Sequence, residues 1–594
     1  MKKVLFLGFC FFLVLFACKK NEKKTVQNNP ELYKIAENYY EEYLKFHPLE
    51  ATAQGDNRYN AELTIDIDPD FLAKEEQYYK NTLTQLNRLP YQQLSENDKV
   101  VFDVLKWKLN DFLEGRKFHL EQIPFTQFDG LPLSFPLLGS GKGNQPFATT
   151  QDYENWLKRM EAFPQWMAQA KINFQAGINN KMVLPKVLVK KMVNQMKAEE
   201  LTSKSIDKNI FFGPIHQFPK SFTTEEKQNL TQKYQTVILN KIIPAYQDMA
   251  DFLENNYLKK ARETDGINAI PNGEALYQYF VKSWTTTNKT PDEIFQIGKV
   301  QVELIRAEML KVKEEVDFQG SLGEFIQLSA KDPKAMPYHS KQEILDEFQK
   351  ILTKISPQLK KYFNVTPITP FEIRATEKFR ETTASAEYVQ GTPDGKRPGI
   401  FYIPIPDPKK FNVTSGMESL FLHEAIPGHH YQISLQQENK NLPRFMRFGW
   451  IGAYGEGWAH YCETLGSELG LYKDPYQKMG YLNDQMLRAV RLVVDTGIHT
   501  GMMPRDVAIG YYMNNIADNQ ANATAAIERY MAVPGQALAY KMGSLKILEL
   551  REKYTKTLGK NFNVAQFHDE ILSQGCLPLD VLDRKMENWA KNQK

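Results

Sequence analysis

The spacing of apolar residues is the feature that most limits the fold of this 594-residue chain. From about residue 30 onward, apolar side chains recur every three or four residues, the spacing of one face of an α-helix. The stretch 290–293 (TPDE) combines an N-cap threonine, a proline at the first helical position and a glutamate three residues after the cap. It predicts a long helix that runs toward Val316. We therefore predict a mainly α fold.

The predicted body is one unit. No repeat and no low-complexity linker divides the chain after residue 30, and 42% hydrophobic content is enough for a large core. We expect residues 31–594 to form a single mainly helical domain with two lobes around a cleft.

One region departs from the helical pattern. Residues 385–392 (SAEYVQGT) and 399–406 (GIFYIPIP) are rich in β-branched and aromatic residues, and Pro393-Asp394-Gly395 lies between them. This pattern predicts a small β-hairpin directly before the main cluster of histidines.

The first residues have the features of an export signal. Two lysines precede an apolar run that is too short to span a bilayer comfortably, and the run ends in Ala17-Cys18. We interpret residues 1–17 as a lipoprotein signal peptide and 18–30 as a tether anchored to a membrane by lipid on Cys18. The alternative is an ordinary cleaved signal. We expect an exported lipoprotein of the cell envelope, anchored at the outer membrane and facing the periplasm or the surface.

Charge and cysteine content exclude two classes of protein. Lys and Arg number 74 against 71 Asp and Glu, so no nucleic-acid partner is expected. Four cysteines cannot form a disulfide framework in a chain of this length. Cys10 leaves with the signal, and whether Cys462 and Cys576 pair stays open.

Half of the ten histidines lie between residues 423 and 499. The segment 423–430 (HEAIPGHH) begins like the HExxH zinc helix, in which two histidines bind one Zn²⁺ and the glutamate activates water. Its fifth position is Pro427, which must break or bulge the helix. Either His429 or His430 would then return to His423, helped by the backbone freedom of Gly428. The alternative is a set of surface polar residues on an ordinary helix.

A second motif supplies a third ligand. In 455–463 (GEGWAHYCE), Glu456, His460 and Glu463 share one helix face. We choose Glu456 as the ligand and expect Glu463 to orient a ligand imidazole. His460 remains an alternative ligand, and a solvated acidic helix is the non-functional alternative.

Further on, polar residues recur at helical spacing. Asp495 could orient His499, which could then donate a hydrogen bond to an oxyanion. Arg488 or Arg491 could bind a substrate carboxylate, although an intrahelical salt-bridge ladder explains the arginines equally well. Tyr540 is a second oxyanion candidate.

These motifs, in this order, resemble the bacterial family of unknown function DUF885. The resemblance extends over nearly the whole body and rests on HEAIPGHHYQ, GEGWAHYCE, RAVRLVVDTGIH and PGQALAYKMG, with GDNRYN, PFTQFDGLP, FFGPIHQFP, IPNGEALY and DGKRPGIFYI upstream. Members of this family are large, exported, mainly helical proteins grouped with the gluzincin type of zinc peptidase. The resemblance therefore implies a zinc-peptidase fold with its active site within residues 385–545.

The resemblance also implies roles for individual residues. His423, His429 and Glu456 become the ligands of one Zn²⁺, and Glu424 becomes the general base. Glu456 lies in a segment similar to the NEGFA-type helix of aminopeptidase N-like enzymes, which favours it over Glu463. His430 is left without a settled role.

The same resemblance implies that the predicted strand at Ser385, Ala386 and Tyr388 holds an extended peptide by strand addition. We expect a zinc-dependent peptidase whose attacking water is activated by Glu424. The alternatives are a non-catalytic binding lipoprotein of the cell envelope and a zinc hydrolase of a non-peptide amide or ester. The physiological substrate, endo- or exo-cleavage, side-chain preference and oligomeric state are not predicted.

Overall fold

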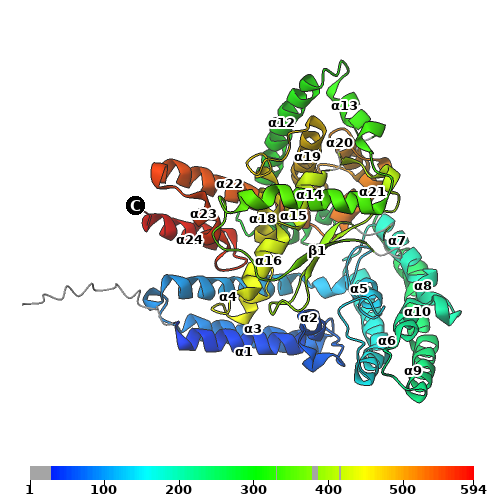
Figure 1. Cartoon of the computed structure of the whole chain (residues 1–594). Helices are drawn as coiled ribbons and strands as arrows, with labels where there is room; N and C mark the ends of the chain where they lie inside the picture. Colours follow the sequence, from blue (N-terminus) through cyan, green and yellow to red (C-terminus); the bar gives the residue numbers. More distant parts are fainter. Residues whose placement is uncertain (1–27, 330, 377–380, 382–384, 414–415, 594) are drawn as a thin grey trace, which may run out of the picture.

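The computed structural model describes residues 28–593 except 330, 377–380, 382–384 and 414–415, and most of this chain is helical (Figure 1). The mainly α prediction is confirmed. The predicted signal peptide, Cys18 and most of the tether lie outside the described residues. Within the described part of the chain, no helix is both long and apolar enough to cross a membrane.

The N-terminal helices pack against the C-terminal ones. The apolar stripe of residues 32–44 lies in the first helix, where nearly all of its side chains are buried. These helices share the largest apolar cluster with the end of the chain (Figure 1). Their bounds are α1 (Pro30–Phe46), α2 (Pro48–Ala53), α3 (Pro69–Asn87), α4 (Glu96–Gly115), α22 (Ala539–Leu558), α23 (Val564–Leu572) and α24 (Leu579–Lys591).

A second group of helices forms its own apolar cluster to one side of the molecule (Figure 1). Its centre is aromatic: Phe135 stacks on Phe163 at 4.6 Å between ring centres, and the Trp156 ring lies 4.5 Å from that of Phe135. The helices are α5 (Leu131–Leu138), α6 (Thr150–Asn179), α7 (Lys186–Met196), α8 (Glu199–Thr202), α9 (Thr224–Val237) and α10 (Ile243–Phe252).

A third group of helices is built around the extensive packing of α12 (Pro291–Glu315) against α19 (Pro475–His499). The helix predicted at 290–293 is present: Thr290 caps it and Glu293 returns a hydrogen bond to the cap. It packs along α19, whose C-terminal half lies in the interior. The group comprises α12, α13 (Leu322–Ser329), α19, α20 (Arg505–Met513) and α21 (Gln520–Ala532). Two other helices lie outside it: α11 (Gly273–Thr285) belongs to a smaller apolar cluster, and α14 (Lys341–Leu359) belongs to the largest one.

A small sheet lies beside these helices. The predicted hairpin is confirmed, because β2 (Glu387–Val389) pairs antiparallel with β3 (Gly399–Ile403). The sequence did not predict β1 (Phe371–Ala375), which pairs parallel with β3 and makes the order β1-β3-β2. Strand β2 is therefore an edge strand of the described sheet.

The two sequence motifs lie on short helices in the middle of the molecule: α15 (Met417–Glu424), α16 (His429–Glu438), α17 (Arg444–Arg447) and α18 (Gly452–Thr464). Helix α18 packs closely along α22, because Gly457 faces Gly543. A Cβ on Gly457 would come within 2.5 Å of the Gly543 Cα. This close approach holds α18 rigidly beside the helix that carries Tyr540.

Candidate metal centre

The helix that carries His423 and Glu424 ends directly after them. Helix α15 ends at Glu424, a cis Ile426–Pro427 bond follows, and α16 begins at His429. The buried Trp458 of α18 donates a hydrogen bond from Nε1 to the Pro427 carbonyl at 2.9 Å. The break that Pro427 predicts is confirmed, and α18 holds it in place.

Gly428 directly precedes α16, where a side chain has no room. A Cβ on Gly428 would lie 1.9 Å from the carbonyl oxygen of His423 and 2.3 Å from that of Leu422. The second helix can therefore turn back against the end of the first only because residue 428 has no side chain.

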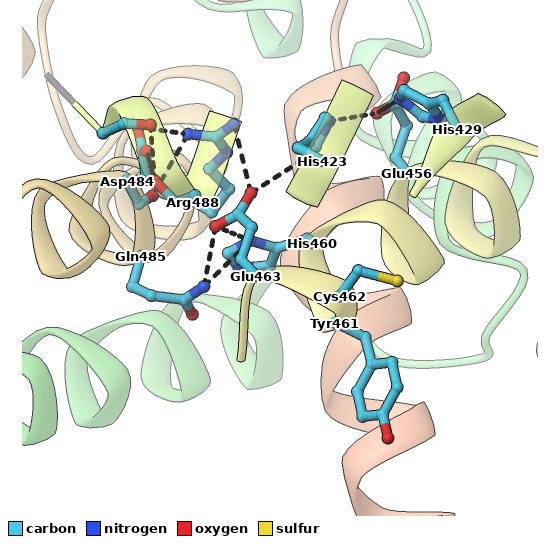
Figure 2. A network of polar contacts seen from close by, with 12 residues as sticks. His423, His429, Glu456, His460, Tyr461, Cys462, Glu463, Asp484, Gln485 and Arg488 are labelled. Carbon is cyan, nitrogen blue, oxygen red and sulfur yellow. Dashed lines mark hydrogen bonds and ion pairs between the residues drawn. The ribbon is translucent and has the colours of Figure 1, made fainter. Parts of the chain in front are cut away.

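This turn brings two histidines and a glutamate together. Among the described residues, one group of three or more potential metal ligands converges: His423, His429 and Glu456, whose ligand atoms all lie within 4.8 Å of one another. The Nε2 atoms of His423 and His429 lie 3.6 and 3.4 Å from the same Glu456 oxygen, Oε2 (Figure 2).

The spacing fits a shared cation. Nitrogen and oxygen ligands at 2.0–2.2 Å from a tetrahedral Zn²⁺ lie roughly 3.3–3.6 Å from one another. Glu456 Oε2 and His429 Nδ1 are buried and make no hydrogen bond to any described residue. An oxygen left in this state is costly unless a cation shares it. The residues present therefore fit one zinc ion with three protein ligands.

The charges of the cluster depend on one another. Burial alone would lower the pKa of His423, but the nearby Glu456 carboxylate and the hydrogen-bonded Glu463 raise it to about 10. Burial opposes ionisation of Glu456, yet His429 and His423 hold its pKa well below the ordinary value. Burial raises the pKa of the adjacent Glu424. The cluster thus keeps one carboxylate charged beside another that binds its proton more tightly.

Glu463 lies on the side of His423 away from Glu456 and contacts the His423 ring (Figure 2). Its Oε1 accepts a hydrogen bond from His423 Nδ1 at 2.8 Å, which is the predicted contact. Its Oε2 lies 3.1 Å from His460 Nδ1 and accepts from Gln485 at 3.0 Å. Since Nδ1 of His423 donates to Glu463, Nε2 is free to face the cluster.

His430 and His460 lie outside the cluster. His430 Nδ1 pairs with the Tyr388 hydroxyl at 3.0 Å, and burial lowers the pKa of His430 to about 4. His460 is fully buried behind Glu463, and burial lowers its pKa to about 3. Of the two histidines that follow Gly428, His429 is the one that reaches the cluster, a choice that helical geometry left open.

The cluster opens into a cavity of about 510 Å³. Besides the three candidate ligands and Glu424, the cavity is lined by Ser385 and Ala386 directly before β2, by Glu387 and Tyr388 of β2, by Leu420, Ile433 and Trp450, by Arg488, Arg491 and Arg529, and by Tyr540. The Tyr540 ring stacks on that of His423 at 6.4 Å between centres. The cavity therefore brings together the predicted base, one predicted oxyanion donor and the predicted strand.

The two predicted arginines have different surroundings. Arg488 pairs with Asp484 at 3.2 Å and lies 3.7 Å from Glu463, so it belongs to the network behind His423 (Figure 2). Arg491 donates from Nε to the Tyr530 hydroxyl at 3.0 Å, and its guanidinium lies 4.7 Å from the centre of the Tyr540 ring.

The predicted pair of Asp495 and His499 does not form. Asp495 accepts hydrogen bonds from the Tyr277 hydroxyl at 2.6 Å and from the Gly535 amide. His499 accepts from the Ile267 amide and faces the Tyr530 carbonyl at 3.0 Å. Both His499 nitrogens are therefore engaged in the interior, away from the residues that line the cavity, and the prediction that His499 stabilises an oxyanion is wrong.

Cys462 and Cys576 are both buried and free, so they do not form a disulfide. Cys462 faces the Pro427 carbonyl at 3.5 Å, while Cys576 lies beside Gln432.

Sequence reasoning missed several residues of the site. Asp484 and Gln485 precede Arg488 by four and three residues on the same helix, and this spacing could have revealed them. Trp450 and Arg529 reach the cavity from separate segments, and no local pattern marks them.

The chain was compared with known families, proteins and structures. None of the curated proteins in the comparison matches it. A structure from Colwellia psychrerythraea, described as a "putative lipoprotein", superposes with a TM-score of 0.89 at 28% identity and covers 94% of this chain and 99% of its own. One from Shewanella oneidensis, a "putative lipoprotein of unknown function", has a TM-score of 0.73 at 19% identity, covers 94% and 100%, and shares the fold.

One protein family matches most of the chain. The DUF885 family, described as "Bacterial protein of unknown function", matches residues 48–586. The match includes the helix break, the third candidate ligand and the cavity residues up to Tyr540. This chain therefore belongs to the DUF885 family.

Proposed function

We propose that this protein is a zinc-dependent peptidase with a gluzincin-like site. The observation that carries the proposal is the convergence of His423, His429 and Glu456 at the spacing of zinc ligands, beside Glu424 and in an open cavity. When bound, zinc would supply Lewis acidity that polarises a carbonyl and acidifies water. The same chemistry serves non-peptide amides and esters, so the substrate class needs a direct test.

Glu424 is the proposed general base. It adjoins a candidate ligand in the sequence, lines the cavity and has a pKa that burial raises above its ordinary value. Its carboxylate would take a proton from the attacking water and return it to the leaving amine. A base is most effective when its pKa lies near the working pH.

Tyr540 is the proposed oxyanion donor. Burial raises the pKa of its hydroxyl, so the hydroxyl keeps its proton at neutral pH. A neutral phenol beside the candidate metal site can donate a hydrogen bond to the oxygen that gains charge. We no longer assign this role to His499.

The edge strand β2 is the proposed binding site for the backbone of the peptide substrate. Tyr388 of β2 lines the same cavity as Glu424, as do Ser385 and Ala386 directly before the strand, and β3 occupies the other edge of β2. An extended peptide could add to the sheet there through main-chain hydrogen bonds.

Metal content and peptide turnover test the proposal. The purified body, residues 28–594, is expected to hold one zinc ion and to cleave members of a quenched-peptide library. Glu424→Gln should keep the zinc and lose turnover by roughly 10²–10⁴-fold. Absence of stoichiometric zinc from the purified protein would refute the proposal. Zinc with no turnover by the unaltered protein would favour a non-catalytic binding lipoprotein.

Export and lipidation are part of the same proposal. The charged start, the apolar run and Ala17-Cys18 support them, as does the description of both structural relatives as "putative lipoprotein". We propose that Cys18 carries the lipid and that the protein is held at the outer membrane. Labelled palmitate should be incorporated by the full chain and not by Cys18→Ser, and membrane fractionation should locate the product.

A further inference from the structure

We propose that the cavity binds the C-terminal carboxylate of its substrate through Arg491 and Arg529, so that the enzyme removes one or two residues from the end of a peptide. This inference rests on the proposed peptidase function and names its substrate class.

Arg491 is a half-buried cation without an acidic partner among the described residues. Its Nε donates to the Tyr530 hydroxyl, but Nη1 is buried and makes no hydrogen bond to a described residue. Within the part of the chain that the structure describes, no carboxylate forms an ion pair with it. Arg488, one turn earlier on α19, has Asp484 and Glu463 beside it. Of these two arginines, Arg491 is therefore the one with charge left to offer a ligand.

Arg529 has similar surroundings. It donates from Nη2 to Gln536 at 3.1 Å and lies 4.5 Å from the centre of the Phe128 ring, while Nε is buried without a partner. Ion pairing to a described carboxylate is absent here as well. Arg491 and Arg529 line one cavity, and both act electrostatically on the Tyr540 hydroxyl. Two such cations are costly unless an anion joins them.

A carboxylate suits these groups. Guanidinium N–H groups match its two oxygens, and an amide or hydroxyl would leave the positive charge uncompensated. Of the carboxylates that line the cavity, Glu424 and Glu456 lie beside the histidines rather than the arginines, and Glu387 lies at the start of β2. The missing anion would therefore come from the substrate.

The distance to the candidate ligands limits how much peptide fits between. The Arg491 guanidinium lies 4.7 Å from the Tyr540 ring centre, which lies 6.4 Å from that of His423, so Arg491 is at most about 11 Å from His423. An extended residue spans about 3.3–3.6 Å, and part of the 11 Å is taken up by the contacts at either end. One or two residues therefore fit between the cleaved bond and the anchored carboxylate.

The first test measures binding without turnover. Zinc-loaded Glu424→Gln is titrated calorimetrically with an N-acetylated tripeptide as the free acid and as the C-terminal amide. The acid should bind about 10–100-fold more tightly, as expected for hydrogen bonds to a charged group. Arg491→Met and Arg529→Gln, each added to Glu424→Gln, should remove most of this preference, whereas Arg491→Lys should retain part of it. Arg306→Gln, in an arginine outside the cavity, is the matched control. Equal affinity for acid and amide would overturn the inference.

The second test maps the products of the unaltered enzyme by mass spectrometry. A free-acid peptide should lose one or two residues from its C-terminus, and amidation should lower kcat/KM by about 10–100-fold. The carboxylate that binds could also belong to an acidic side chain, and amidated peptides with one internal Asp test this. If these peptides are cleaved at a fixed distance from the Asp, whatever the state of the C-terminus, the inference is overturned. If the free acid still binds more tightly than the amide but no peptide is cleaved, the result would support the carboxylate site and refute the proposed peptidase function.

Discussion

Glu463 joins the candidate metal cluster to the protein interior. It is 1% exposed. Its two oxygens accept hydrogen bonds from His423 and Gln485, and one of them lies 3.1 Å from His460 Nδ1. Its neighbours His460, Arg488 and His423 overcome its burial and hold its pKa well below the ordinary value. A carboxylate that stays ionised in this position fixes the tautomer of His423 with Nε2 available to a metal.

Neutralising Glu463 should weaken zinc binding without removing a ligand. Glu463→Gln is nearly isosteric but replaces a charged acceptor of the His423 proton by a neutral amide. We expect zinc affinity, measured by competition with a chelator, to fall about 10–100-fold. The exposed variant Glu549→Gln should leave the affinity unchanged. Unchanged affinity in Glu463→Gln would show that Glu463 does not orient the ligand.

The two histidines after Gly428 give a second prediction. His429→Ala should abolish stoichiometric zinc binding, because it removes one of three ligands. His430→Ala should retain zinc, because His430 contacts Tyr388 instead. Metal analysis of both purified variants is the measurement. The reverse pattern would refute the assignment of His429.

His499 should make the protein sensitive to acid. It accepts from the Ile267 amide at Nδ1 and therefore carries its proton on Nε2, and burial lowers its pKa to about 3. In the unfolded chain the His499 imidazole is protonated below about pH 6.5, whereas in the folded chain it stays neutral at that pH. The stability that this histidine contributes is therefore complete above pH 6.5 and is lost as pH falls toward 3, by about 2 kcal/mol between pH 7 and pH 5.

Urea unfolding at pH 7 and pH 5 checks this sign. His499→Gln should lose about 2 kcal/mol less than the unaltered protein between the two pH values. The solvent-exposed His119→Gln should follow the unaltered protein. If the loss is the same in His499→Gln, the neutral buried state is wrong.

At the level of the element, the break between α15 and α16 shapes the candidate site. Two short helices meet end to end, and each contributes one histidine from its terminal turn. The Trp458 hydrogen bond to the Pro427 carbonyl then ties the break to α18, the helix that supplies Glu456 and Glu463. Three helices are thereby fixed relative to one another around one cluster.

Gly428→Ala should disrupt this junction. The added methyl would clash with two backbone carbonyl oxygens, which cannot move as a side chain could. We expect a loss of about 2–4 kcal/mol in the free energy of unfolding, and weaker zinc binding. Gly510→Ala, in a helix where the new Cβ meets no atom within 4 Å, is the matched control and should stabilise by about 0.5–1 kcal/mol. Equal behaviour of the two variants would contradict this account of Gly428.

At the level of the whole molecule, the candidate centre lies where distant parts of the chain meet. Its cavity draws on β2, α15, α16, α18, α19, α21 and the start of α22, and the surrounding apolar cluster includes the first and last helices. Metal binding should therefore stabilise the entire body rather than one local segment.

Zinc should raise the unfolding temperature of the metal-free body. A ligand that binds only the folded state at a free concentration 100 times its Kd stabilises by about 2.7 kcal/mol. Glu456→Gln should reduce the effect, because Gln is a weaker ligand, while Mg²⁺ should produce little, because it prefers oxygen ligands. Differential scanning calorimetry with and without zinc measures the shift. A zinc effect that Glu456→Gln retains in full would place the ion elsewhere.

The sequence by itself determined the properties that depend on neighbours along the chain. The period of apolar residues predicted helices such as α1 and α12, because one buried stripe and one cap are local features. Pro427 predicted the break, since a missing N–H acts within one turn. The hairpin followed from its turn residues, whereas the alternating pattern of 371–375 (FEIRA) was overlooked because the strand is short and its partner, β3, follows more than twenty residues later.

Only the tertiary structure decided which polar residues meet. The helical spacing of Asp495 and His499 suggested a pair, but packing directs them to Tyr277 and to Ile267. The same packing brings His429 rather than His430 to the cluster and gives Arg488, but not Arg491, an acidic partner. Spacing along a helix fixes which residues share a face, while the contacts of that face depend on elements hundreds of residues away, and these set the final positions of the side chains.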